Sequence, residues 1–136
     1  MSTINSDKIL ISRSNNVVFN FVSDFDNFGK LMPEQVTDWK STVDTCSFTI
    51  SGMASLSMRM TIRQQFDKIV MTSEGKTPFA FELICHFKSI SNDSSEAQIV
   101  FDADLSPMIA MMATRPLQNF VNILVHKLKE YAEANL

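Results

Sequence analysis

Two pairs of ionisable side chains have a spacing that suits acid–base chemistry. Asp102 and Asp104 stand two residues apart, and Glu82 and His86 stand four residues apart. Since side chains alternate between the two faces of a strand, the members of each pair would share one face. Two carboxylates can act as general acid and base, and a carboxylate beside a histidine can do the same or bind a metal.

The apolar residues that alternate with these charged residues place both pairs on the outer side of the predicted sheet. Phe101 and Ala103 alternate with the two aspartates, and Phe81, Leu83 and Cys85 alternate with the glutamate and the histidine. The apolar set is expected in the core, which leaves the charged set in solvent. We therefore predict no catalytic residue, and an acid–base pair remains the alternative.

The other reactive residue types do not assemble a metal or nucleophile site. His126 is the only further histidine and lies in a C-terminal helical segment, whereas a histidine metal site needs several convergent ligands. Cys46 and Cys85 each lie in an apolar run and lack zinc-ligand spacing, so we predict buried thiols, with a disulfide as the alternative. No nucleophile-elbow sequence surrounds any serine. No metal and no cofactor are predicted.

Length and charge narrow the class of protein. With 136 residues and 45% hydrophobic content, the chain is expected to form one domain over residues 1–136. The net charge of −3 gives no positive field for a phosphate backbone, so nucleic acid is not an expected partner.

The sequence predicts a cytoplasmic protein without a membrane-spanning segment. The first eight residues lack the pattern of a secretory signal. The apolar stretch from Met108 to Ala113 is far shorter than the roughly 20 residues that cross a bilayer. The oligomeric state stays open.

The N-terminal part of the chain predicts one strand and two short helices. Residues 6–12 are predicted to form the strand. Ser14 or Asn15 would cap a helix that runs to Ser23. Asp24 would cap a second helix that runs to Leu31, with a proline two residues further on to end it.

From residue 36 to residue 105 the hydrophobic period changes to two, which predicts strands. The alternation is clearest over 54–63, 79–88 and 97–105, and it is weaker over 46–50 and 69–71. The segment 36–41 is ambiguous, because Val36 and Trp39 would lie on opposite faces of an ideal strand. A bulge or a rim is one position for Trp39, and the direction of its side chain stays open. These segments predict a curved antiparallel sheet of about six or seven strands.

A long C-terminal helix is predicted to begin at Ser106 and Pro107, a capping residue followed by a proline. Its apolar stripe would lie against the concave face of the sheet. Pro116 is expected to bend the helix. Its first turns would then tip towards a mouth formed with residues 25–32 and the strand connections.

This order of elements resembles the START and polyketide-cyclase superfamily, also called SRPBCC or pollen-allergen-like, over almost the whole chain. The resemblance is carried by residues 8–13 leading into 16–21, the Asp24-Phe25-Asp26-Asn27-Phe28 helix, Leu31-Met32-Pro33 and the Ser106-Pro107 helix start. It implies the α+β helix-grip fold, with a cavity between the sheet and the long helix. The pattern of a named enzyme is not present, and the chain looks like a small bacterial member of the superfamily.

The resemblance implies a small binding or carrier protein whose partner is an apolar or amphipathic small molecule. Methionine suits a pocket that repacks around its ligand, although the same side chains also suit a filled core. Two alternatives are a cyclase- or aromatase-like enzyme acting on a polyketide-type substrate and a protein-interaction module. The predicted ligand-binding residues are Phe48, Leu56, Met58, Met60, Met71, Phe79, Phe81, Leu83, Phe101, Met108, Met111, Met112 and Phe120.

Overall fold

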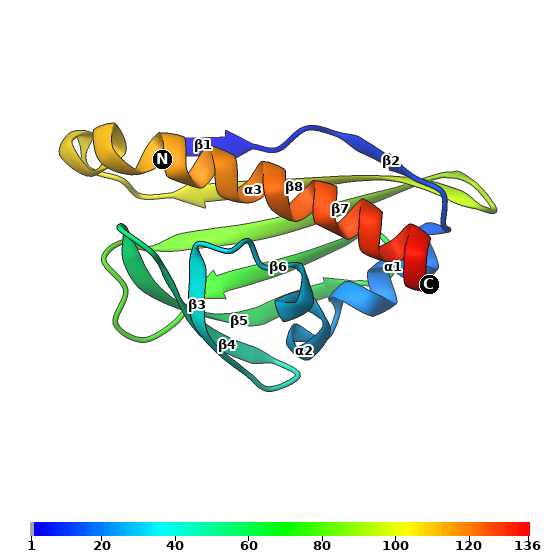
Figure 1. The fold of residues 1–136 in the computed structure, drawn as a ribbon, viewed down its shortest axis with the longest axis horizontal. Helices are drawn as coiled ribbons and strands as arrows, with labels where there is room; N and C mark the ends of the chain where they lie inside the picture. The colour runs from blue at the N-terminus through cyan, green and yellow to red at the C-terminus, as the bar shows by residue number, and fades with distance from the viewer. Residues whose placement is uncertain (1) are drawn as a thin grey trace.

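A curved antiparallel sheet that wraps around one long C-terminal helix makes up most of the structure, a computed structural model that describes residues 2–136 (Figure 1). The strand order is β1-β8-β7-β6-β5-β4-β3, and β2 also pairs with β8. This is the predicted helix-grip fold. Its elements are β1 (Ser2–Asn5), β2 (Ile9–Ile11), α1 (Asn15–Val22), α2 (Phe25–Phe28), a 3-10 helix (Gly29–Leu31), β3 (Val36–Ser41), β4 (Thr45–Ile50), β5 (Ala54–Gln64), β6 (Lys68–Ser73), β7 (Phe81–Ser91), β8 (Ser94–Ala103) and α3 (Pro107–Asn135).

The predicted helix caps are confirmed. The side chains of Ser14, Asp24 and Ser106 each accept a hydrogen bond from a backbone N–H two or three residues further on, at 2.8 to 3.3 Å. Each cap satisfies a donor that the first helical turn leaves unpaired. Pro107 is the first residue of α3, where its missing N–H costs nothing.

The strand predicted over 6–12 is shorter, β2 (Ile9–Ile11), and a further strand that was not predicted, β1 (Ser2–Asn5), precedes it after a break. Asn5 pairs with Val100 and Ile9 pairs with Ala97, so one extra residue lies on the N-terminal side. Ser6 holds this break in place: its hydroxyl accepts from the backbone N–H of Ile99 at 2.8 Å. The sheet therefore has eight strands instead of the six or seven predicted.

Trp39 lies at a bulge in β3, one of the positions that the sequence left open. Asp38 has a φ of 56°, and the pairing of β3 with β4 shifts after Thr37. The Trp39 ring stacks on Phe48 with the ring centroids 5.4 Å apart. A Cβ atom on Gly29 would lie 2.3 Å from the indole nitrogen, so only glycine fits there without a shift of the ring.

A second bulge corrects the predicted alternation of β5. Met58 and Met60 face the core as predicted, but the pairing with β6 shifts between Met60 and Ile62. Because one extra residue reverses the faces of a strand, Ile62 lies on the outer side and is 48% exposed.

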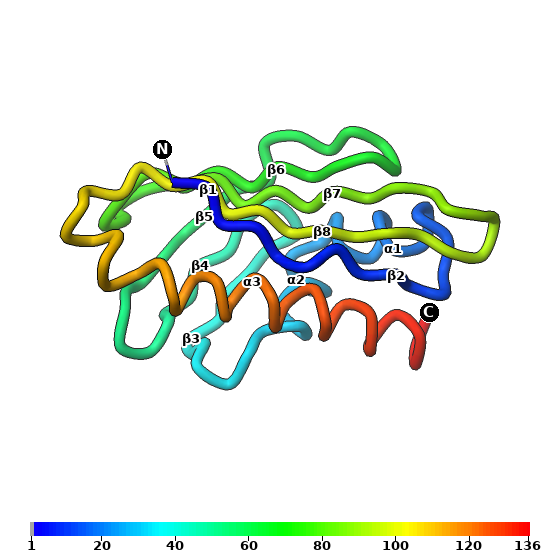
Figure 2. Tube along the Cα trace, turned by 90° about the horizontal axis from the view of Figure 1, so that it is seen from above, coloured from blue at the N-terminus to red at the C-terminus, as the bar shows by residue number. Residues whose placement is uncertain are grey.

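Helix α3 lies against β1, β2 and β8 (Figure 2). The buried side chains of α3 form its apolar stripe, which packs into the core. The helix continues through Pro116. No helix in residues 2–136 is long and apolar enough to cross a membrane. The stripe residues that are buried are Ala113, Leu117, Phe120, Val121, Leu124 and Leu128, and Tyr131 is half-buried against Phe21.

Candidate functional site

The first candidate site is the space between the concave face of the sheet and α3. Every strand from β4 to β8 sends apolar side chains into it. Ten of the thirteen predicted ligand-binding residues are buried there, each with 8% exposure or less. They are Phe48, Leu56, Met58, Met60, Met71, Phe79, Phe81, Leu83, Phe101 and Phe120.

Aromatic rings fill much of this space by direct contact. Phe81 and Phe101 stack across neighbouring strands with centroids 5.0 Å apart, and Phe79 meets Phe101 edge-on at 6.4 Å. Phe48 stacks on Phe120 of α3 at 6.1 Å, which ties the sheet to the helix. Any molecule held here would have to take the place of these contacts.

The other three predicted residues lie at the surface. Met108, Met111 and Met112 are 74%, 89% and 74% exposed, whereas Ile109 of the same segment packs against the core. They form an apolar patch on the first two turns of α3. The turn at residues 51–53 and the connection at 74–80 lie at the same end of the molecule (Figures 1 and 2). We call this end the loop end.

The predicted mouth is corrected in one respect. Residues 25–32 do not lie beside the first turns of α3. Lys127 donates to the backbone oxygen of Met32 at 3.3 Å, and the Lys30 ammonium lies 5.9 Å from the Tyr131 ring centroid. At about 1.5 Å per residue, this contact is roughly 24 Å along the helix from Met111. A mouth at the loop end would be formed by α3 and the strand connections alone.

Polar groups inside the core are few in the part of the chain that the structure describes. The buried polar residues are Ser6 and Ser95. The Ser6 hydroxyl donates to the Asp7 carbonyl at 2.8 Å, whereas the Ser95 hydroxyl has no partner within residues 2–136. Neither serine is a strong acid or base, so the interior offers hydrogen bonding rather than proton transfer.

The candidate acid–base residues face outward, as the alternation predicts. Glu82 lies directly opposite Asp102 in the pairing of β7 with β8. Phe81, its neighbour, is 2% exposed and faces the core. Asp104 and His86 are exposed. None of the four reaches the space under α3.

Both cysteines are free and buried, which confirms the predicted thiols. Burial raises the pKa of the Cys46 thiol far above its usual range, and it raises the pKa of Cys85 to about 12. Since the thiolate is the nucleophile, both side chains are unreactive and serve as small apolar groups in the core.

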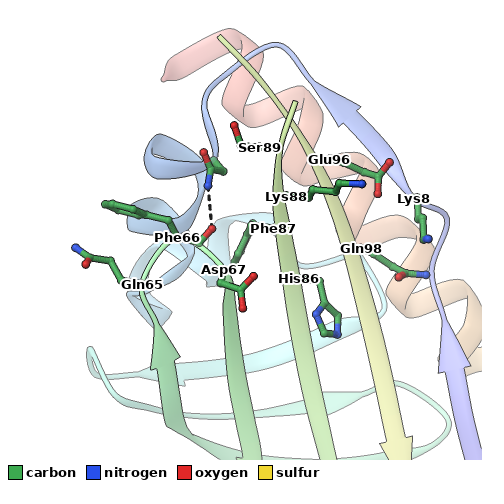
Figure 3. A pocket seen from close by; sticks show the side chains of 11 residues that line it. Lys8, Gln65, Phe66, Asp67, His86, Phe87, Lys88, Ser89, Glu96 and Gln98 are labelled. Atoms are coloured by element: carbon green, nitrogen blue, oxygen red, sulfur yellow. Dashed lines mark hydrogen bonds between the residues drawn. The ribbon is translucent and has the colours of Figure 1, made fainter. Parts of the chain in front are cut away.

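A second candidate site lies on the outer face of the sheet. A hollow of about 560 Å³ opens between the start of α1, the β5–β6 turn and the outward side chains of β7 and β8 (Figure 3). Sequence reasoning missed it, because its walls come from segments that are far apart in the chain. Its lining residues are Lys8, Asn15, Gln65, Phe66, Asp67, His86, Phe87, Lys88, Ser89, Glu96 and Gln98.

The arrangement of sheet, short helices and long C-terminal helix is the helix-grip fold of the START superfamily. A START superfamily protein from Mycobacterium smegmatis superposes with a TM-score of 0.73 at 13% identity, over 98% of this chain and 99% of that one. The predicted resemblance is confirmed at the level of the fold.

Two further solved structures have the same fold. XoxI from Bacillus cereus matches with a TM-score of 0.76 at 11% identity, over 97% of this chain and 96% of that one. Norcoclaurine synthase from Thalictrum flavum, in complex with dopamine and hydroxybenzaldehyde, matches with a TM-score of 0.74 at 9% identity, over 99% of this chain and 88% of that one. No family model and no curated protein matches the sequence.

Proposed function

We propose that this protein binds and carries an apolar or amphipathic small molecule between the sheet and α3. The observation that carries the proposal is the composition of that space. Its walls are apolar on every strand from β4 to β8, and the polar groups among its buried residues are serine hydroxyls. Such a lining matches the mostly apolar, sparsely polar character of small-molecule sites.

The fold adds support. Norcoclaurine synthase, which shares it, holds dopamine and hydroxybenzaldehyde, two small molecules with apolar rings and polar ends. The interior here is closed by its own rings, so the ligand enters by repacking. Met58, Met60 and Met71 contribute unbranched, flexible side chains to the core, and these adjust to a new neighbour at low cost.

Entry is proposed at the loop end. The exposed patch of Met108, Met111 and Met112 offers an apolar surface to a molecule that leaves water, and Ile109 leads from this surface to the core. Large apolar side chains exposed together mark interaction sites more often than chance allows.

Met111→Trp and Met112→Trp are expected to reduce uptake of an amphipathic fluorescent probe, anilinonaphthalene sulfonate, because a rigid indole at the loop end blocks repacking there. Both residues are exposed, so the free energy of unfolding should change by less than about 0.5 kcal/mol. Fluorescence titration gives the uptake and thermal melting gives the stability.

The matched control is Asn119→Trp, an exposed position further along α3. It adds the same ring away from the loop end and should leave uptake unchanged. If both methionine variants bind the probe as the unmodified protein does, the entry site is misplaced. If the unmodified protein takes up no probe, the carrier proposal fails.

A protein-interaction module is the second candidate function, and the same patch favours it. Three exposed methionines on one helix could bind a partner protein without any ligand in the core. The two functions separate in the experiment above. A surface that only binds a partner protein would depend on Met111 but would not require the interior to take up the probe.

A further inference from the structure

The outer-face hollow of Figure 3 lies on the opposite side of the sheet from the apolar core. His86 and Lys88 project into it from β7, while Phe87 between them points into the core. Its volume of about 560 Å³ falls within the range of roughly 300 to 1,000 Å³ that small-molecule sites occupy. A ligand in this hollow would not compete with one under α3.

One wall of the hollow is a strained turn held in place by its neighbours. Phe66, at the centre of the β5–β6 turn, has a φ of 62°, which is unfavourable for a residue with a side chain. The Asn15 side-chain amide donates to the Phe66 carbonyl at 3.0 Å, and the Phe66 ring meets Phe19 edge-on at 5.7 Å. Strain of this kind persists only where the surroundings fix it, so the wall is preformed.

The turn is also fixed to the sheet. The backbone N–H of Phe87 donates to the carbonyl of Asp67 at 2.7 Å. This bond places Asp67 beside β7, where Figure 3 shows its carboxylate on the same side as His86. The acidic and basic groups of the hollow therefore come from elements that cannot move far apart.

Charges of both signs line the hollow and do not neutralise one another by contact. Lys88 lies opposite Glu96 in the pairing of β7 with β8, and Lys8 and Asp67 come from two connections. The four ion pairs found within residues 2–136 all lie elsewhere. The two lysines and the two carboxylates cancel one another in formal charge.

We propose that this hollow binds a small zwitterion, a molecule that carries an ammonium and a carboxylate on one short chain. An ion with a single negative charge would be attracted by the lysines but repelled by Asp67 and Glu96. An ion with a single positive charge would be attracted by the two carboxylates but repelled by the lysines. A ligand with both charges satisfies both sets. Gln65 and Ser89, which also line the hollow, carry groups that can form hydrogen bonds.

The test is a titration followed by amide NMR shifts, with glycine, β-alanine, γ-aminobutyrate and ε-aminohexanoate as probes. We expect saturable shifts at residues 65–67 and 86–89 for at least one of the four. Butyrate and butylammonium, which each carry a single charge, should bind more weakly. Equal binding of butyrate, or no saturable shift with any amino acid, would overturn the proposal.

Matched variants test whether the charged side chains of the hollow cause the amide NMR shifts. Lys88→Met and Glu96→Gln should each weaken binding of the best amino acid about two- to fivefold, the range expected of exposed charge pairs. Lys76→Met and Glu34→Gln remove the same charges outside the hollow and should leave binding unchanged. Wild-type affinity in both hollow variants would refute the assignment. The uptake of anilinonaphthalene sulfonate reports separately on the core, so either proposal can fail alone.

Discussion

Phe81→Asp is expected to unfold the protein. Phe81 is 2% exposed, stacks on Phe101 at 5.0 Å and contacts Phe79 edge-on at 6.0 Å. A carboxylate at this position would be buried without a partner, at a cost of several kcal/mol. That cost is comparable to the whole stability of a small domain, about 5 to 15 kcal/mol. Circular dichroism should show the loss of the folded state at room temperature.

The control is the next residue along the strand. Glu82 faces outward opposite Asp102, so Glu82→Gln removes one of two like charges from the surface. Its free energy of unfolding should change by no more than about 0.5 kcal/mol. Equal destabilisation by the two variants would mean that β7 presents its faces in a different register.

Leu124→Ala is expected to lower the free energy of unfolding by about 2 to 5 kcal/mol. Leu124 has no exposed surface and lies in the stripe of α3 that faces the sheet. Truncation removes apolar contacts on both sides and leaves a cavity that the surrounding strands fill only in part. Urea unfolding followed by fluorescence of Trp39 measures the change.

Met112→Ala is the matched control, because it shortens an apolar side chain of the same helix that is 74% exposed. Its stability should stay within about 0.5 kcal/mol of wild type. A loss as large as that of Leu124→Ala would mean that the first turns of α3 pack against something in solution, such as a second chain.

The sequence predicts most of the fold because its strongest signals are local. Capping residues lie where α1, α2 and α3 begin, and the alternation of β7 and β8 sorts Phe81 from Glu82 correctly. Each signal depends only on residues a few positions apart. Local patterns of this kind suffice when the inner and outer faces of an element differ sharply in polarity.

The bulges could not be predicted from the same patterns. Ile62 continues the apolar alternation of β5, yet the shift after Met60 turns it outward. The break at Ser6 depends on a hydrogen bond to Ile99, 93 residues away. A bulge is set by the partner strand, so the sequence of one strand alone does not reveal it.

The residues of the two candidate sites also differ in whether local sequence patterns predict them. The ten buried members of the predicted ligand set follow from strand alternation and the helix stripe. The orientation of Met108, Met111 and Met112 depends on how the first turns of α3 lie over the sheet, which no local pattern fixes. The outer-face hollow joins Lys8, the turn at Asp67 and strand β7, and only the folded sheet brings these together.

Native mass spectrometry of gently purified protein tests the carrier proposal most directly. We expect a second species that is heavier than the chain by one small molecule. Organic extraction should release this molecule, and its skeleton should be largely apolar. Loading with anilinonaphthalene sulfonate should displace that molecule. A single species at the mass of the bare chain, together with no uptake of the probe, would contradict the proposal and leave the space under α3 as a filled core.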